Sequence, residues 1–429
     1  LVGAYGSSTA ITPALDRMAS EGVLLDQCFL DSQQLHEQLR SLWTGAHALQ
    51  TGPLPWNLWQ SFAARWGSSS SAAVSARLLT DSPQVAELAE QMGCPQITLI
   101  EPRTASPSVQ LPTGDLDRDR LEGPVHAPAE DSSQCAVMEL LATAVSELAS
   151  GPPGLIWIHS RGLRHAWDAP LAMRAQFADP EDPEPPSEVE LPSTAIDAET
   201  DPDFVVGWGQ VAAAQAAVID EGLSALRDTV AHRSDSTAWS WLFSTLGGVP
   251  LGEHGHMGWG HSQMFGSELH TATIVVPAQS LPIGLRRPEL FQLPDIGATL
   301  AGLLELDLPA TVWGQNALEL GASQSPDRWP REFRLAMLAG TLHSWLRTPA
   351  WSAVLSNEEL NNDDAQSDSY TEQLFVKPED RWEVSQIADR RRDIVELHRQ
   401  LLPLFATAAQ RGQRSALPVL VDDLLNLLR

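Results

Sequence analysis

The segment from Ala238 to Gly260 constrains the fold most, because it joins an apolar run to a Gly-Gly turn and a histidine-bearing loop. A short apolar run of this kind is typical of a buried parallel strand in an α/β protein. Open α/β sheets bind their ligands in the loops that follow the carboxyl ends of such strands. The loop that carries His254, His256 and His261 is therefore our first candidate for a functional site.

The length and composition predict a large globular protein. A chain of 429 residues exceeds one typical domain, which predicts a large α/β core with a smaller appended unit. Hydrophobic residues make up 43% of the chain, which indicates a packed interior. No run of about 18 consecutive apolar residues occurs, so we expect no transmembrane segment.

The charge argues against a nucleic-acid-binding protein, and the cysteine content argues against a disulfide-rich or thiolate-metal protein. The formal net charge of −28 argues against nucleic acid as a partner, since the phosphate backbone requires clustered Lys and Arg. Cys28, Cys94 and Cys135 are too scattered to predict a disulfide framework or a thiolate metal site. The partner and the compartment, cytoplasmic or exported, stay open, because the sequence begins at Leu1 without Met and a leader is compatible with it.

Three stretches resemble the sulfatases, which belong to the alkaline-phosphatase superfamily. Gly252-Glu253-His254-Gly255 resembles the end of the SDHG…GEHG segment of that family. The opening LVGAYG and the following ITPALDRMASEGVLLDQCFLDS resemble the family's GxYG turn, helix and strand. Residues 271–309 resemble a third family stretch, with its landmarks in order.

The resemblance implies an organisation for nearly the whole chain. It predicts a doubly wound, alkaline-phosphatase-like α/β core over residues 1–330 and a small antiparallel α+β subdomain over residues 331–429. The family's N-terminal strand, with two metal-binding Asp residues, would lie upstream of this sequence. Two acidic, proline-rich inserts, 101–131 and 179–203, are expected to interrupt the core as flexible loops.

Local patterns predict individual elements. Thr12 is expected to cap a helix that starts at Pro13, with a strand at 23–30 after it. Apolar spacing predicts a helix at 136–148 and another at 210–230, whose Asp220 occupies the family's acidic position. The apolar run that ends at His159 predicts a strand.

The resemblance also places the family's reactive residues, and this chain lacks them. The sulfatase nucleophile is a Cys or Ser in C/S-x-P-x-R, where the cysteine is converted to formylglycine, and no such motif occurs here. Alignment on the helix end LWTG puts Leu35 at the nucleophile, Glu37 at the proline and Leu39 at the arginine. The chain therefore resembles a degenerate sulfatase that cannot form the aldehyde nucleophile.

The family binds calcium or magnesium partly through the Asp and the His or Asn of SDHG. The matching residues here are Thr245 and Leu246, so we expect no metal cofactor. His159 and His165 match the histidines that shape the family's pocket floor. Together with Leu35, Glu253 and His254, these residues define a predicted remnant pocket.

Two functions follow as hypotheses. The first is a sulfatase-like pseudoenzyme that keeps the scaffold for a binding or structural role, which includes a protein-interaction scaffold built on the tryptophan-rich C-terminal unit. The alternative is a divergent hydrolase of sulfuric or phosphoric esters that holds a non-standard metal such as zinc with His254, His256 and His261.

Overall fold

The structure is a computed structural model that describes residues 1–67, 74–100, 127–152, 154–259, 264–278, 284–320, 329–340, 343–356 and 372–426. Most of the first predicted insert, residues 101–126, lies outside the described residues, and so does His261. In the described parts, no helix is long and apolar enough to cross a membrane.

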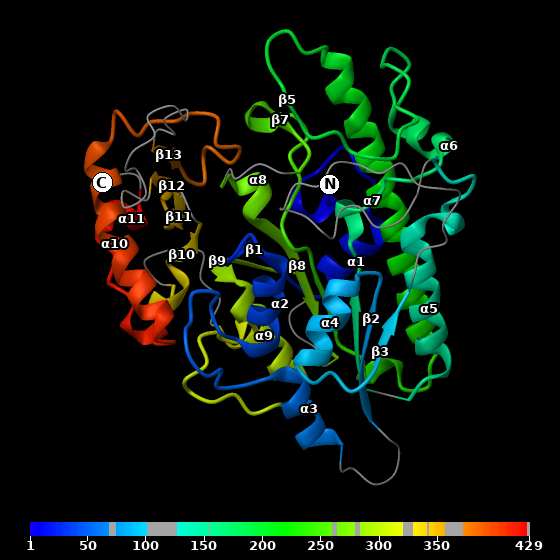
Figure 1. Ribbon diagram of the computed structural model, residues 1–429, viewed down its shortest axis with the longest axis horizontal. Coiled ribbons are helices and arrows are strands. Elements are labelled where there is room, and N and C mark those ends of the chain that lie inside the picture. Colours follow the sequence, from blue (N-terminus) through cyan, green and yellow to red (C-terminus); the bar gives the residue numbers. More distant parts are fainter. Residues whose placement is uncertain are drawn as a thin grey trace.

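The described strands form two larger sheets in the core, one small ribbon beside them, and a separate antiparallel sheet (Figure 1). The first core sheet has the order β6 (Trp241–Ser244), β8 (His270–Val276), β1 (Val23–Phe29) and β9 (Leu285–Gln292). The second has the order β3 (Ile97–Leu99), β2 (Ser75–Thr80) and β4 (Gly154–His159), all parallel. The ribbon pairs β5 (Thr194–Ala195) with β7 (His256–Met257).

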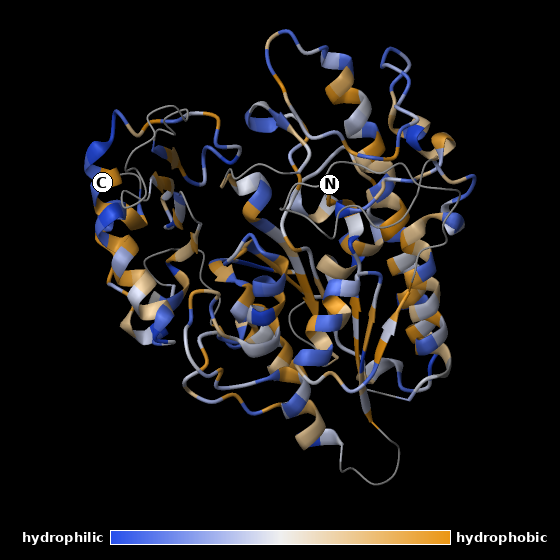
Figure 2. Cartoon of the chain, in the orientation of Figure 1, coloured by the Kyte–Doolittle hydropathy of each residue, from blue (hydrophilic) through white to orange (hydrophobic). Residues whose placement is uncertain are grey.

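Helices cover these sheets. Their bounds are α1 (Pro13–Glu21), α2 (Leu35–Thr44), α3 (Leu58–Trp66), α4 (Pro83–Gln91), α5 (Ala136–Ser150), α6 (Leu171–Arg174), α7 (Pro202–Ala231), α8 (Gly266–Leu269) and α9 (Leu293–Leu303). Apolar residues gather along the central strands, whereas hydrophilic residues lie on the outer helix faces (Figure 2). The predicted α/β core is thus confirmed, with parallel and antiparallel strand pairs together.

The C-terminal part forms its own antiparallel sheet beside the core (Figure 1). Its strands are β10 (Ala336–Ala339), β11 (His343–Arg347), β12 (Trp351–Ser356) and β13 (Gln373–Val376), paired in chain order. The helices α10 (Arg392–Gln410) and α11 (Asp422–Leu425) follow, and their apolar faces share one hydrophobic cluster with this sheet. The expected antiparallel subdomain is confirmed.

The start of α1 is stabilised differently from the prediction. Thr12 precedes the helix, but its hydroxyl accepts a hydrogen bond from Gly3 N at 2.9 Å and does not cap α1. The buried carboxylate of Asp220, on α7, instead accepts from Ala14 N at 2.8 Å and Leu15 N at 2.9 Å. A negative group at a helix N-terminus satisfies free N–H groups and suits the helix dipole. A contact between residues some 200 positions apart thus replaced the local cap.

The strand near the start of the segment 238–260 also departs from expectation. β6 is only partly buried and pairs antiparallel with β8, its one described neighbour, whereas a buried parallel strand was predicted. Its other edge has no strand partner among the described residues, and neither has the outer edge of β4. A strand with one open edge keeps part of its surface accessible, which explains the incomplete burial.

The second predicted insert, residues 179–203, is anchored to the core in its middle part. Val189 and Leu191 are buried, and the guanidinium of Arg174 donates to the carbonyls of Pro186 and Glu188. Because the segment is acidic and proline-rich as a whole, its composition did not predict that these two apolar residues would be buried. These contacts attach the part around 186–191 to the core, and the flexibility of the whole segment stays a prediction.

Candidate functional site

The candidate site is a cavity of about 2210 Å³ that spans the carboxyl ends of β1, β4 and β6. It also reaches between the facing edges of β4 and β6, because every residue of these two strands contributes to its lining. Of the seven predicted pocket residues, the structure brings six to this cavity: Leu35, His159, Thr245, Leu246, Glu253 and His254. His165 lies just beyond the cavity lining, after the loop that follows β4.

The position expected for the nucleophile is occupied by an aliphatic side chain. Leu35 is the first residue of α2 and packs against the largest hydrophobic cluster. Leu39, at the position of the family's arginine, is buried in the same cluster, and Glu37 pairs with Arg40 at 2.6 Å. None of these side chains offers a nucleophilic atom to the cavity.

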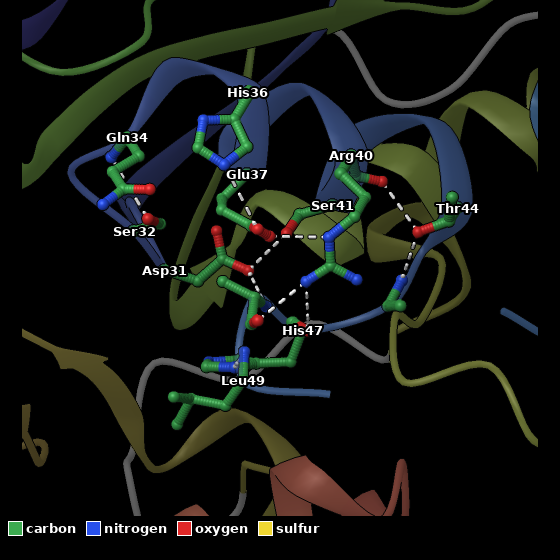
Figure 3. Close-up of polar contacts among 12 residues, drawn as sticks. Asp31, Ser32, Gln34, His36, Glu37, Arg40, Ser41, Thr44, His47 and Leu49 are labelled. Atoms are coloured by element: carbon green, nitrogen blue, oxygen red, sulfur yellow. Dashed lines mark hydrogen bonds and ion pairs between the residues drawn. The ribbon is translucent and has the colours of Figure 1, made fainter. Parts of the chain in front are cut away.

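The hydroxyl and carboxyl groups around the start of α2 are engaged with each other (Figure 3). Ser41 donates to the Asp31 carboxyl at 2.7 Å, and Ala48 N donates to the same oxygen at 2.8 Å. Burial raises the pKa of Asp31 to about 7. Ser32 accepts a hydrogen bond from Gln34 N at 3.1 Å, and neither Ser32 nor Ser41 lines the cavity.

The position expected for the metal does not fit a calcium or magnesium ion. Thr245 Oγ1 accepts from Ala272 N at 2.9 Å, and this bond prolongs the pairing of β6 with β8. Leu246 packs against the main hydrophobic cluster and offers no donor atom. Hard cations require several oxygen ligands, mostly carboxylates. Among the described residues no group of three His, Cys, Asp or Glu side chains is arranged to hold a metal.

The GEHG loop adopts a tight conformation. His254 has a left-handed backbone with φ of 56° between Gly252 and Gly255, both also left-handed. Its ring stacks on Phe265 with centroids 3.5 Å apart, and burial lowers its pKa. Glu253 accepts a hydrogen bond from Leu251 N at 2.6 Å. The loop histidine is thus held by packing in a strained turn.

The proposed zinc set is not assembled by the described residues. His256 is buried on β7, which pairs with β5, whereas His254 lies on the preceding 3-10 turn against Phe265. His261 lies outside the described residues, so this set stays a prediction.

The end of β4 concentrates basic residues, several of which the sequence reading missed. His159 Nδ1 lies 2.9 Å from Thr80 Oγ1, and its pKa is lowered to about 4 by burial and then by Arg161 and Arg164. The pKa of His165 is also lowered to about 4, by burial and by Arg161. Both imidazoles are therefore neutral at pH 7.

The C-terminal subdomain supplies one wall of the cavity, which the sequence reading also missed. Lys377, Arg381, Trp382 and Glu383 all line it. Lys377 Nζ and Glu383 Oε1 form a buried ion pair at 3.1 Å, and Glu383 Oε2 accepts from the backbone N–H of Gly266 at 2.6 Å. The hydrogen bond between Glu383 and Gly266 joins the subdomain to the start of α8, and the ion pair with Lys377 neutralises the buried carboxylate. Local sequence patterns do not predict the Glu383–Gly266 contact, because its two residues are 117 positions apart.

Comparisons with known proteins identify the fold. Neither protein-family models nor curated protein sequences give a match. Among solved structures, the chain is similar to the phosphonate monoester hydrolase of Agrobacterium radiobacter, with a TM-score of 0.67 at 15% identity over 95% of this chain and 93% of that one. It is also similar to a phosphonate monoester hydrolase from Silicibacter pomeroyi, with a TM-score of 0.63 at 14% identity over 94% and 91% of the two chains.

A 2-O GAG sulfatase is similar to the same extent, with a TM-score of 0.62 at 16% identity over 96% of this chain and 90% of that one. These likenesses show that the chain has the fold shared by sulfatases and phosphonate monoester hydrolases. At such identities they carry the fold and not the activity.

Proposed function

We propose that this chain is a sulfatase-like pseudoenzyme, which keeps the fold and the pocket of a hydrolase for a binding or structural role. The observation that carries the proposal is Leu35, an aliphatic residue packed at the start of α2, where the family has its nucleophile. The replacement of Asp and His or Asn by Thr245 and Leu246 supports it. Loss of several catalytic groups together removes many orders of magnitude, since each 1.36 kcal/mol is tenfold in rate.

The direct test is hydrolysis of three chromogenic substrates: an aryl sulfate, an aryl phosphate and an aryl phosphonate monoester. We expect no release of the phenol above a buffer control for any of them. The matched control is His254→Ala, purified in parallel. Saturable turnover that is lost in this variant would overturn the proposal, whereas turnover of equal size in both preparations would be traced to a contaminant.

The alternative function is a divergent ester hydrolase with a non-standard metal. Its support is that the solved structures with this fold named above are hydrolases. The alternative requires turnover that depends on zinc and on His254. The same assay with added zinc therefore decides between the two proposals.

We also propose that the core covers residues 1–330, with an additional strand supplied upstream of this sequence, and that residues 331–429 form the second unit. Support for the strand comes from the two open edges of β4 and β6, which face one cavity with apolar side chains. Buried backbone N–H and C=O groups need partners, and an extended segment would supply them. Amide exchange in β4 and β6 should be slower in a longer gene product than in this chain; equal rates would contradict the proposal.

A further inference from the structure

A guanidinium group lies almost fully buried just after the carboxyl end of β4 and makes no hydrogen bond to any of the described residues. The side chain of Arg161 is 5% exposed, and it contributes to the lining of the cavity. Its one ion pair among the described residues joins Nε to Asp81 Oδ1 at 3.9 Å, which is too long for a hydrogen bond. Nε of Arg161 is buried and has no hydrogen-bond acceptor within the part of the chain that the structure describes. A buried charge in this state is costly unless a ligand satisfies it.

The carboxylate of Asp81 lies nearest to the Arg161 guanidinium, but its hydrogen bonds go to backbone and hydroxyl groups. Asp81 Oδ1 accepts from the backbone N–H of Arg161 at 2.8 Å, and its Oδ2 accepts from Ser160 Oγ at 3.4 Å. The carboxylate therefore organises the loop after β4. It leaves the guanidinium fork of Arg161 available on the cavity side.

The same turn carries a second arginine that lines the cavity. Arg164 follows Arg161 by three positions, across the 3-10 turn Gly162–Arg164, and Arg164 N donates to Arg161 O at 2.8 Å. Residues three apart on such a turn project from the same side. The Arg164 guanidinium lies 4.5 Å from the centre of the Trp259 ring, and this stacking fixes its plane.

We propose that Arg161 and Arg164 form a guanidinium pair that binds the oxyanion group of a small organic anion, independently of any metal ion. The fork of a guanidinium matches a carboxylate, sulfate or phosphate group through two parallel N–H···O bonds. The apolar body of the ligand would lie against the loop side chains beyond the strand ends, which line the same cavity: Leu30, Leu35, Leu163, Leu246 and Trp259.

The other charged groups at the cavity are compatible with an anion there. Burial raises the pKa of Glu268 to about 8, so this carboxyl is largely protonated at pH 7 and can donate a hydrogen bond. Glu253 accepts a backbone hydrogen bond in the GEHG loop. The other acidic residues of the lining each form an ion pair with a basic residue: Asp26 with Arg286, Asp235 with Arg233, and Glu383 with Lys377. The net charge of −28 repels anions at long range, but physiological salt screens it beyond about 8 Å.

This inference rests on the proposed function, because it assigns a ligand class to a pocket that is argued to bind without hydrolysis. The two can fail separately. Hydrolysis would overturn the pseudoenzyme proposal and leave the anion site standing, whereas absence of both binding and hydrolysis would overturn the anion site alone.

The test is calorimetric titration of the protein at pH 7 in EDTA with benzoate, phenyl sulfate and phenylphosphonate as probes. We expect saturable binding of at least one probe with one site per chain. Arg161→Lys keeps the charge but loses the fork, and Arg164→Gln loses the charge; each is expected to weaken binding about tenfold or more. Arg411→Gln, at an exposed arginine far along the chain, is the matched control and should bind as the parent does.

A second readout separates binding from a change in fold. Burial, and then the charge of Arg161, lower the pKa of His165, so an anion beside Arg161 should raise that pKa by offsetting the second cause. Titration of the histidine ring signals by NMR, with His165→Gln for assignment, should show this rise on addition of the probe. No saturable binding of any probe, binding that EDTA abolishes, or equal affinity in Arg161→Lys would each overturn the proposal.

Discussion

The guanidinium of Arg414 forms a two-point ion pair with the carboxylate of Asp295, and this pair joins the segment after α10 to the first turn of α9. The two side chains are 6% and 0% exposed. The Asp295 carboxylate also accepts from Gln292 N and Gln315 N, each at 2.9 Å. One carboxylate therefore fixes a helix start, a loop and the C-terminal subdomain together.

Replacement of Arg414 should be strongly destabilising. Arg414→Met leaves Asp295 buried without its cation, and loss of one partner of a buried ion pair costs about 3–5 kcal/mol in the free energy of unfolding. Urea unfolding measures the loss. The matched control is Arg392→Met, whose pair with Asp389 is 65% and 78% exposed, and which should cost less than about 1 kcal/mol. Similar losses in both variants would show that the buried pair is not the main link.

The crossing of α2 and α9 should tolerate no side chain at Gly297. A Cβ at Gly297 would lie 2.3 Å from the carbonyl oxygen of Leu42, so Gly297→Ala must push the two helices apart. Such overpacking costs about 1–3 kcal/mol. Gly209, on α7, has open space where a Cβ would be, so Gly209→Ala should be neutral or stabilise by up to about 1 kcal/mol through helix propensity. Thermal melts should show a lower melting temperature than the parent for Gly297→Ala, and an equal or higher one for Gly209→Ala.

Because of Asp31, the free energy of unfolding should fall as the pH rises from about 4 to 7. Its pKa in the folded protein is raised to about 7 by burial, above the ordinary value near 3.8. Between about pH 4 and 7 the unfolded chain has lost this proton while the folded chain keeps it, so the free energy of unfolding falls with rising pH. Asp31→Asn removes this contribution. Its stability relative to the parent should therefore increase from pH 4 to 7; a constant difference across that range would refute the raised pKa.

Divalent ions should not stabilise this chain. A ligand present at one hundred times its Kd adds about 2.7 kcal/mol to the folded state, which a thermal melt detects. Because Thr245 and Leu246 stand where the family has metal ligands, millimolar calcium or magnesium should leave the melting temperature unchanged, and EDTA should do the same. A shift with zinc that disappears in His254→Ala would instead favour the divergent hydrolase.

Local patterns in the sequence predicted much of the fold. The predicted strand that ends at His159 is β4. The predicted helix at 136–148 is α5, which is two residues longer. These elements follow from apolar spacing and from glycine and proline breaks, which act within a few residues. Six of the seven residues of the predicted remnant pocket line one cavity, while its function stays a prediction.

Contacts between distant residues could not be predicted. Asp220 replaced Thr12 as the partner of the α1 N-terminus, and Glu383 joined the C-terminal subdomain to Gly266 at the cavity. Arg161 carries no signal in the sequence, because an arginine after a strand is normally solvated and only the fold shows that it is enclosed. Such contacts depend on which elements pack together, which apolar periodicity does not specify.

The facing edges of β4 and β6 divide the core into two sheets that can open separately. No backbone hydrogen bond between described residues joins the two core sheets, so they are coupled by side-chain packing. The helix α7 packs against α5 on one side and α1 on the other, and residues of both sheets share the main hydrophobic cluster with α2 and α3. Regions linked only by side-chain packing unfold locally as separate cooperative units. Each sheet should therefore show its own rate of hydrogen exchange, and a molecule bound across both would be recognised by slowing the two rates together.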